Sequence, residues 1–139
     1  MRRSLFLTTA LVCVFVRLAP LCAAEPKIEF NRDIRPILSD ACFHCHGPDS
    51  AKRQAGLRLD QEEAAKGERD GHRAIFAGEA VRSELVRRIT SADPDEVMPP
   101  RNSNRSLTPA QIELLKKWID QGAQWQSHWS FLAPPGSPM

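Results

Sequence analysis

Apolar residues recur every three or four positions in three stretches of the chain, and this spacing predicts three helices. The first stretch runs from residue 30 to residue 41, and its apolar members are Phe30, Ile34, Ile37, Leu38 and Ala41. Asn31 is a candidate N-cap for this helix. Pro36 lacks an N–H and clashes with the preceding turn. We therefore expect the regular helix to begin near Pro36, after a looser turn.

The second stretch predicts a surface helix with one buried stripe. Val81, Leu85 and Ile89 recur every four residues, with Val86 beside them. Three arginines, at positions 82, 87 and 88, fall on the other faces, as expected for a half-buried helix. We interpret these arginines as a solvated face; the alternative is a docking surface for an acidic partner protein.

The third stretch is the last predicted helix. Thr108, Pro109 and Gln111 supply an N-cap, a proline at the first helical position and a glutamine at the third, which together favour a helix start. The apolar stripe that follows comprises Ile112, Leu114, Leu115, Trp118 and Ile119. Gly122 is placed to cap the end of the helix. We expect this helix to cross the first one.

The segment between the first two helices predicts shorter elements. Residues 47–50 (Gly-Pro-Asp-Ser) break the first helix, and a short extended stretch surrounds Leu57 and Leu59. Asp60 and Glu63 have the spacing of a capping box for a brief helix that ends near Gly67. Residues 67–78 read as irregular, with Ile75 and Phe76 as a core plug. The pattern as a whole predicts an all-α fold of about three to five helices.

Residues 1–24 read as a secretory signal peptide. Two arginines follow Met1, a short apolar run comes next, and small residues end at Ala24, where we expect cleavage. Lipidation at Cys22 is an alternative, but Leu21 before it is a poor fit. Cleavage would remove three of the 19 basic residues and none of the 17 acidic ones. The remaining chain would have a net charge near −1, which gives no basis for nucleic-acid binding. The apolar run of the leader is too short to span a bilayer, so we expect no stable membrane insertion after cleavage.

The candidate chemistry lies in residues 42–46, Cys-Phe-His-Cys-His. Two cysteines separated by two residues and followed directly by a histidine form the c-type haem attachment signature. On a helical turn, Cys42 and Cys45 share one face, where both thiols can add to the vinyl groups of a haem. His46 can then reach the iron. We therefore expect one covalently bound haem c.

Two other chemistries share this motif. A structural zinc site normally needs four nitrogen or sulfur ligands, but Cys42 and Cys45 are the only cysteines left after leader removal. A dithiol redox pair usually follows a strand of a βαβ unit, whereas this segment reads as helix. Haem attachment is the interpretation that the sequence favours.

Six segments resemble the planctomycete-type cytochrome c domain: FNRDIRPIL at 30–38, CFHCH at 42–46, GLRLD at 56–60, SELVRRI at 83–89, MPP at 98–100 and LT at 107–108. The resemblance runs from about residue 30 to residue 131. It implies a small cytochrome c-like fold around one haem, attached on the outer side of the bacterial inner membrane. We therefore expect a periplasmic location. In that family the domain usually heads a much longer polypeptide.

Met98 is the candidate second axial ligand. Apart from Met139 it is the only methionine after the leader, it precedes Pro99 and Pro100, and it matches the Met-Pro-Pro element of the family. Methionine is otherwise a common core filler. The rivals for this position are His72, His128, water or an open site. Arg101 or Arg105 could pair with a haem propionate, although exposed loop charges explain them equally well.

We expect three segments: the signal peptide at 1–24, a cytochrome c domain at 25–127 and a proline-rich tail at 128–139. The favoured function is electron transfer with an unknown redox partner protein. The protein would be an electron carrier or a redox module detached from a larger enzyme. No catalytic acid–base group appears beside the motif. The alternatives are a haem-based sensor with an open sixth position, and a small zinc-binding interaction protein.

Overall fold

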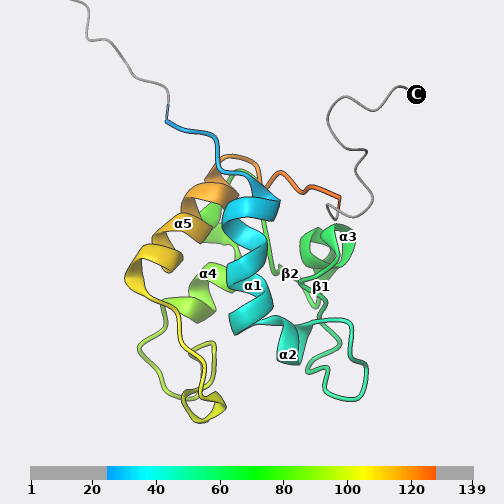
Figure 1. The fold of residues 1–139 in the computed structure, drawn as a ribbon. Helices are drawn as coiled ribbons and strands as arrows, with labels where there is room; N and C mark the ends of the chain where they lie inside the picture. Colours follow the sequence, from blue (N-terminus) through cyan, green and yellow to red (C-terminus); the bar gives the residue numbers. More distant parts are fainter. Residues whose placement is uncertain (1–24, 128–139) are drawn as a thin grey trace, which may run out of the picture.

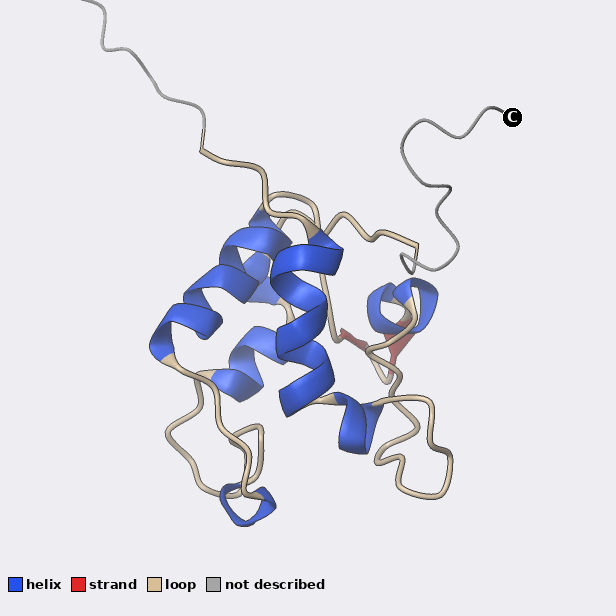
Figure 2. Ribbon diagram, in the orientation of Figure 1, coloured by secondary structure: helices blue, strands red, loops and turns tan. Residues whose placement is uncertain are grey.

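The computed structural model describes residues 25–127, which fold into a small helical unit. Five α-helices, one π-helical turn and two 3₁₀ turns surround a core and carry one short hairpin (Figures 1 and 2). The expected helical class is therefore confirmed, and the hairpin is an addition to the predicted all-α fold. The expected signal peptide and proline-rich tail, with His128, Trp129 and Phe131, lie outside the described residues.

The first predicted helix consists of two parts. A π-helical turn, η1 (Phe30–Ile34), leads into α1 (Arg35–Ala41), which has Pro36 in its first turn. The regular helix thus begins where the proline allows it. The prediction that Asn31 caps the helix is wrong. Asn31 lies inside η1, and its side chain accepts a hydrogen bond from Arg35 Nε at 2.9 Å.

The last predicted helix is α5 (Pro109–Asp120), and its start is as expected. Thr108 Oγ1 accepts the backbone N–H of Gln111, and the Gln111 side chain accepts the N–H of Thr108 at 2.9 Å. Helix α5 ends at Asp120 with Gln121 as its C-cap, and the next residue, Gly122, adopts a φ of +95°. Few residues other than glycine tolerate that conformation, which explains the glycine at this end.

The turn η1 and helix α5 pack together through aromatic side chains. The rings of Phe30 and Trp118 lie 5.6 Å apart, and Trp125 stacks against Phe30 at 4.3 Å. Trp118 is fully buried, and its indole N–H donates to the Gln124 carbonyl at 3.2 Å. The expected crossing of the first and last predicted helices is confirmed, and Trp125 packs against the core beside it.

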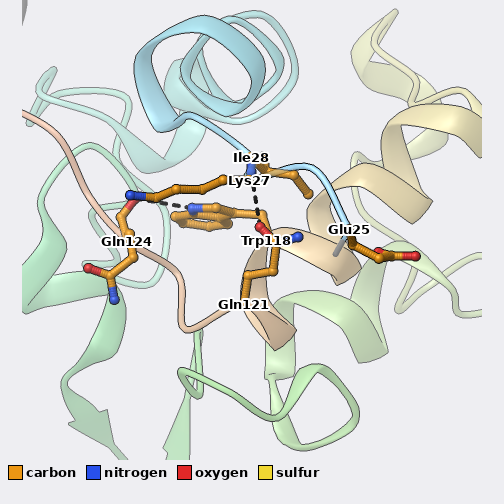
Figure 3. A pocket seen from close by; sticks show the side chains of 6 residues that line it. All are labelled: Glu25, Lys27, Ile28, Trp118, Gln121 and Gln124. Atoms are coloured by element: carbon orange, nitrogen blue, oxygen red, sulfur yellow. Dashed lines mark hydrogen bonds between the residues drawn. The ribbon is translucent and has the colours of Figure 1, made fainter. Parts of the chain in front are cut away.

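The segment before η1 is tied to the end of α5. Gln121 accepts a hydrogen bond from the backbone N–H of Ile28 at 2.9 Å and donates to the Pro26 carbonyl. Figure 3 shows this contact beside a surface cavity of about 380 Å³ between residues 25–28 and the end of α5. None of the residues expected to bind haem lines this cavity.

Two predictions for the middle of the chain fail in detail. The brief helix exists as α3 (Glu62–Lys66) and ends at Gly67, but its N-cap is Gln61 and has no side-chain cap bond. Asp60 instead pairs with Arg58. The segment read as irregular contains the hairpin of β1 (Glu68–Arg69) and β2 (His72–Arg73), in which Glu68 pairs with Arg73.

The predicted stripe of the second helix is also partly wrong. Helix α4 (Glu84–Ile89) buries Leu85, Val86 and Ile89, but Val81 is 89% exposed. Val81 belongs to a separate 3₁₀ turn, η2 (Ala80–Arg82), and Ser83 between the two elements is extended. This break shifts the helical phase, so that Ala80 is buried in place of Val81.

Helix α2 (Phe43–His46) and two loops surround the candidate site. Residues 47–61 and residues 90–108, the latter containing the 3₁₀ turn η3 (Arg101–Ser103), lie at the same end of the molecule as α2 (Figure 1). Ile75 is fully buried, as predicted for a core plug, whereas Phe76 is half-buried beneath the Arg82 guanidinium. No helix among residues 25–127 is long and apolar enough to span a membrane.

Candidate haem site

The cysteines and histidine of the motif lie on one tight turn. Cys42 ends α1 and begins α2, and its carbonyl accepts the backbone N–H groups of Cys45 at 3.1 Å and His46 at 2.8 Å. Residues three and four apart on such a turn share a face. The turn therefore presents both sulfurs and the imidazole on one side, as the motif predicts.

The loop that follows the motif folds back over it. The Cys45 carbonyl accepts the Gln54 N–H at 2.8 Å, and the His46 carbonyl accepts the Leu59 N–H at 2.7 Å. Gly47 begins this loop in close contact with the preceding turn, where a Cβ would collide with the Phe43 carbonyl oxygen. The loop and the turn thus form one wall around the three side chains.

Both cysteines are free and half-buried. Burial, with a smaller contribution from the neighbouring Cys45, raises the pKa of the Cys42 thiol to about 12. A thiol with that pKa stays protonated at neutral pH and is not an activated nucleophile. This environment differs from that of a reactive dithiol pair, in which the attacking cysteine has a lowered pKa.

His46 is half-buried, and its Nδ1 atom is buried without a hydrogen-bond partner among the described residues. Burial lowers the pKa of the His46 imidazole, and the backbone of Gln54 opposes this shift. The imidazole is therefore neutral at neutral pH, which is the form that binds metals. An unpaired buried nitrogen costs free energy, and a bond from this imidazole to a metal would offset that cost.

Two apolar cavities meet at this turn. Cavity A, of about 250 Å³, and cavity B, of about 170 Å³, share Cys42, His46, Ala55 and Met98 in their walls. The remaining walls of cavity A are Leu57, Leu59, Ala74, Glu84, Leu85 and Arg88. Those of cavity B are Ala41, Cys45, Gln54, Pro99, Pro100, Ser103 and Arg105. The combined space is in the range of cofactor sites, roughly 300–1,000 Å³.

Met98 reaches these cavities from the loop after α4. Its backbone N–H donates to the Arg88 carbonyl at 3.1 Å, which holds the loop against the end of the helix. The peptide bond between Met98 and Pro99 is cis, and Pro99 lines cavity B. The structure thus places Met98 and His46 in the walls of the same two cavities.

The other histidines lie elsewhere. His44 is exposed on α2, His72 is exposed in β2, and neither lines cavity A or cavity B. His128 lies outside the described residues. Of the two loop arginines, Arg101 is exposed and lines neither cavity, whereas Arg105 lines cavity B and donates to the Asp40 carbonyl at 3.1 Å.

Two charged residues of α4, Glu84 and Arg88, line cavity A, although neither was predicted to lie at the site. Glu84 accepts hydrogen bonds from Arg87 and Arg88, and these contacts lower the pKa of Glu84 to about 2. The sequence contains a signal for the position of Arg88. Arg88 follows the buried Leu85 by three positions, and residues at that spacing share a helix face.

One comparison with known proteins found a match to this chain. A family model described as Planctomycete cytochrome C matches residues 42–102. The match confirms the resemblance to the planctomycete-type cytochrome c domain. It spans the attachment motif, both hairpin strands, α4 and Met98. No curated protein and no solved structure matches the chain.

A c-type cytochrome family implies haem c with its iron, and the residues fit that group. Three features fit haem c and occur together: two neighbouring free thiols, a buried imidazole nitrogen without a partner among the described residues, and two adjoining apolar cavities. A structural zinc site instead needs four ligands. Within residues 25–127, no group of three or more His, Cys, Asp or Glu side chains is close enough to hold a metal ion.

Proposed function

We propose that this protein is an exported mono-haem c-type cytochrome that transfers electrons. Cys42 and Cys45 hold the haem through thioether bonds, and His46 and Met98 are its axial ligands. The family match supports an electron carrier rather than an enzyme. The observation that carries the proposal is that Cys42, His46 and Met98 all line both cavity A and cavity B.

The surroundings of the motif suit a bound redox centre. Leu57, Leu59 and Leu85 give cavity A an apolar lining, and the prolines after Met98 do the same in cavity B. Apolar walls exclude water and limit the rearrangement that accompanies a change of charge. When bound, the haem supplies the chemistry, a one-electron change between Fe(II) and Fe(III).

The axial pair determines what the site can do. A thioether opposite an imidazole raises the reduction potential relative to two imidazoles. It also closes the sixth position to small ligands, which a sensor would need to leave open. The approach of Met98 to the cavities therefore supports the carrier over the sensor.

The location and the partner follow from the same proposal. The signal-like residues 1–24 support export, and attachment of haem c outside the inner membrane places the protein in the periplasm. The domain is expected to extend over residues 25–127. Its partner is a redox protein that receives or donates one electron.

Absorption spectra of the purified, matured protein test the proposal. We expect c-type bands in the visible region, a weak near-infrared band from methionine bound to ferric iron, and no carbon monoxide binding. Ready binding of carbon monoxide by the ferrous protein would support the sensor instead. A protein that binds metal but remains colourless would contradict both haem functions.

A further inference from the structure

Arg88 lines cavity A, and the proposed electron transfer gives this residue no role. It comes from the last turns of α4, and with Glu84 it is one of two charged residues in an otherwise apolar wall. We propose that the Arg88 guanidinium binds a haem propionate. This inference rests on the proposed haem site and adds a binding residue that anchors the carboxylate edge of the cofactor.

The chemistry of haem determines which cavity receives the propionates. Its two vinyl groups, which form the thioethers, lie on the side of the porphyrin opposite the two propionates. Both cysteines line cavity B, whereas only Cys42 borders cavity A. The thioether edge therefore belongs to cavity B, and the propionate edge points into cavity A toward Arg88. Arg105, the arginine of cavity B, lies on the thioether side.

The guanidinium of Arg88 has donors to spare. Its Nε donates to Glu84 at 2.8 Å, and Nη1 makes a long contact of 3.5 Å with the Glu96 carbonyl. Nη2 has no hydrogen-bond partner among the described residues. The planar fork of an arginine suits a carboxylate in a bidentate arrangement. Arg88 can therefore keep Glu84 and accept a propionate.

Glu84 divides its hydrogen bonds between two arginines, and Arg87 also pairs with Glu96 through Nη1 at 2.7 Å. Arg87 donates to Glu84 through Nε at 2.8 Å and through Nη2 at 2.7 Å, so the carboxylate is already paired from the solvent side. Arg87 does not line cavity A. The two neighbouring arginines therefore share one glutamate, but only Arg88 faces the haem space.

The test compares four variants of the matured protein: Arg88→Gln, Arg88→Lys, Arg87→Gln and Arg105→Gln. Arg87→Gln is the control, because it removes one positive charge next to Glu84 from a residue that does not line cavity A and that pairs with Glu84 and Glu96. The readouts are the propionate bending band in the resonance Raman spectrum, which rises in frequency with hydrogen bonding, and the reduction potential. Intact mass first establishes that each variant carries haem.

We expect Arg88→Gln to shift the propionate band to lower frequency and to lower the reduction potential, since loss of a nearby cation favours ferric iron. Arg88→Lys should restore the potential more than the band, because lysine keeps the charge but not the fork. Arg87→Gln should leave the band unchanged. An unchanged band in Arg88→Gln, or a shift in Arg105→Gln alone, would overturn the assignment. Wild-type protein without haem would instead refute the proposed function itself.

Discussion

Met98 lines the same two cavities as His46, although 52 positions separate them in the chain. The contact that holds Met98 there is local, from its N–H to the Arg88 carbonyl at the end of α4. Helix α4 in turn packs its Leu85 into the wall of cavity A. Helix α4 and this hydrogen bond therefore position Met98 near His46.

Replacing Met98 should open the sixth position. In Met98→Ala we expect loss of the near-infrared band, a lower reduction potential and ready binding of carbon monoxide, because the thioether ligand is gone. Spectroscopic titration of the ferrous protein measures this. Val97→Ala is the control, since Val97 precedes Met98 and lines neither cavity. Equal carbon monoxide binding by wild type and Met98→Ala would show that Met98 is not a ligand.

Removing the haem should destabilise the domain. Cavities A and B are apolar spaces of about 250 and 170 Å³, and unfilled apolar space costs stability. We expect the haem-free protein to melt at least about 10 °C below the matured protein, which corresponds to roughly 2 kcal/mol for a domain of this size. Calorimetry measures this difference. Equal melting temperatures and equal protease resistance would argue against haem as part of the core.

The aromatic crossing of η1 and α5 should dominate the apolar core. Trp118 is 1% exposed and contacts both Phe30 and Trp125. Truncation of a buried tryptophan costs about 3–5 kcal/mol, so Trp118→Ala should lower the free energy of unfolding by that amount. Trp125→Ala, at a half-buried position, should cost less. Denaturant unfolding of the matured variants tests the order, and a larger loss at Trp125 would contradict it.

Glu84 should make stability depend on pH in the acid range. Hydrogen bonds from Arg87 and Arg88 lower its pKa from the ordinary 4.5 to about 2. The carboxylate therefore contributes stability above pH 4.5, and that contribution is lost as the pH falls through about 2. After solvent screening we expect about 1 kcal/mol.

The Glu84→Gln variant isolates this contribution. It should be less stable than wild type at pH 6 and equally stable near pH 2, as measured by denaturant unfolding. Glu113→Gln is the control, because Glu113 pairs only with Lys116 on the exposed side of α5. A stability difference for Glu84→Gln that does not change with pH would contradict the role of the ionised carboxylate.

Local signals in the sequence predicted the best-defined parts of the fold. The capping box of Thr108 and Gln111 and the proline start of α1 depend on residues within one helical turn. The motif at 42–46 is likewise one turn, so its spacing alone predicted that Cys42, Cys45 and His46 share a face. Such features need no knowledge of distant contacts.

Features that depend on backbone breaks or on distant packing were missed. The extended Ser83 interrupts the helical period. The four-residue spacing of Val81 and Leu85 therefore wrongly predicted that both side chains are buried on one stripe. The hairpin strands have only two polar residues each, although Asp70 and Gly71 in the turn, both with positive φ, are a recognised hairpin signal. The spacing of Arg88 from Leu85 is a local signal for its helix face, but the cavity that Arg88 lines is closed by loop residues such as Leu57 and Met98, and no local pattern predicts how those loops fold.

The most direct test of the account is the intact mass of the exported protein, compared with Cys42→Ser/Cys45→Ser and with His44→Ala. His44 lies inside the motif but is exposed and lines neither cavity. We predict a mass increase of one haem in wild type and in His44→Ala, and none in the double cysteine variant. Wild-type protein without added mass, with both thiols open to alkylation where other c-type cytochromes mature, would contradict the account.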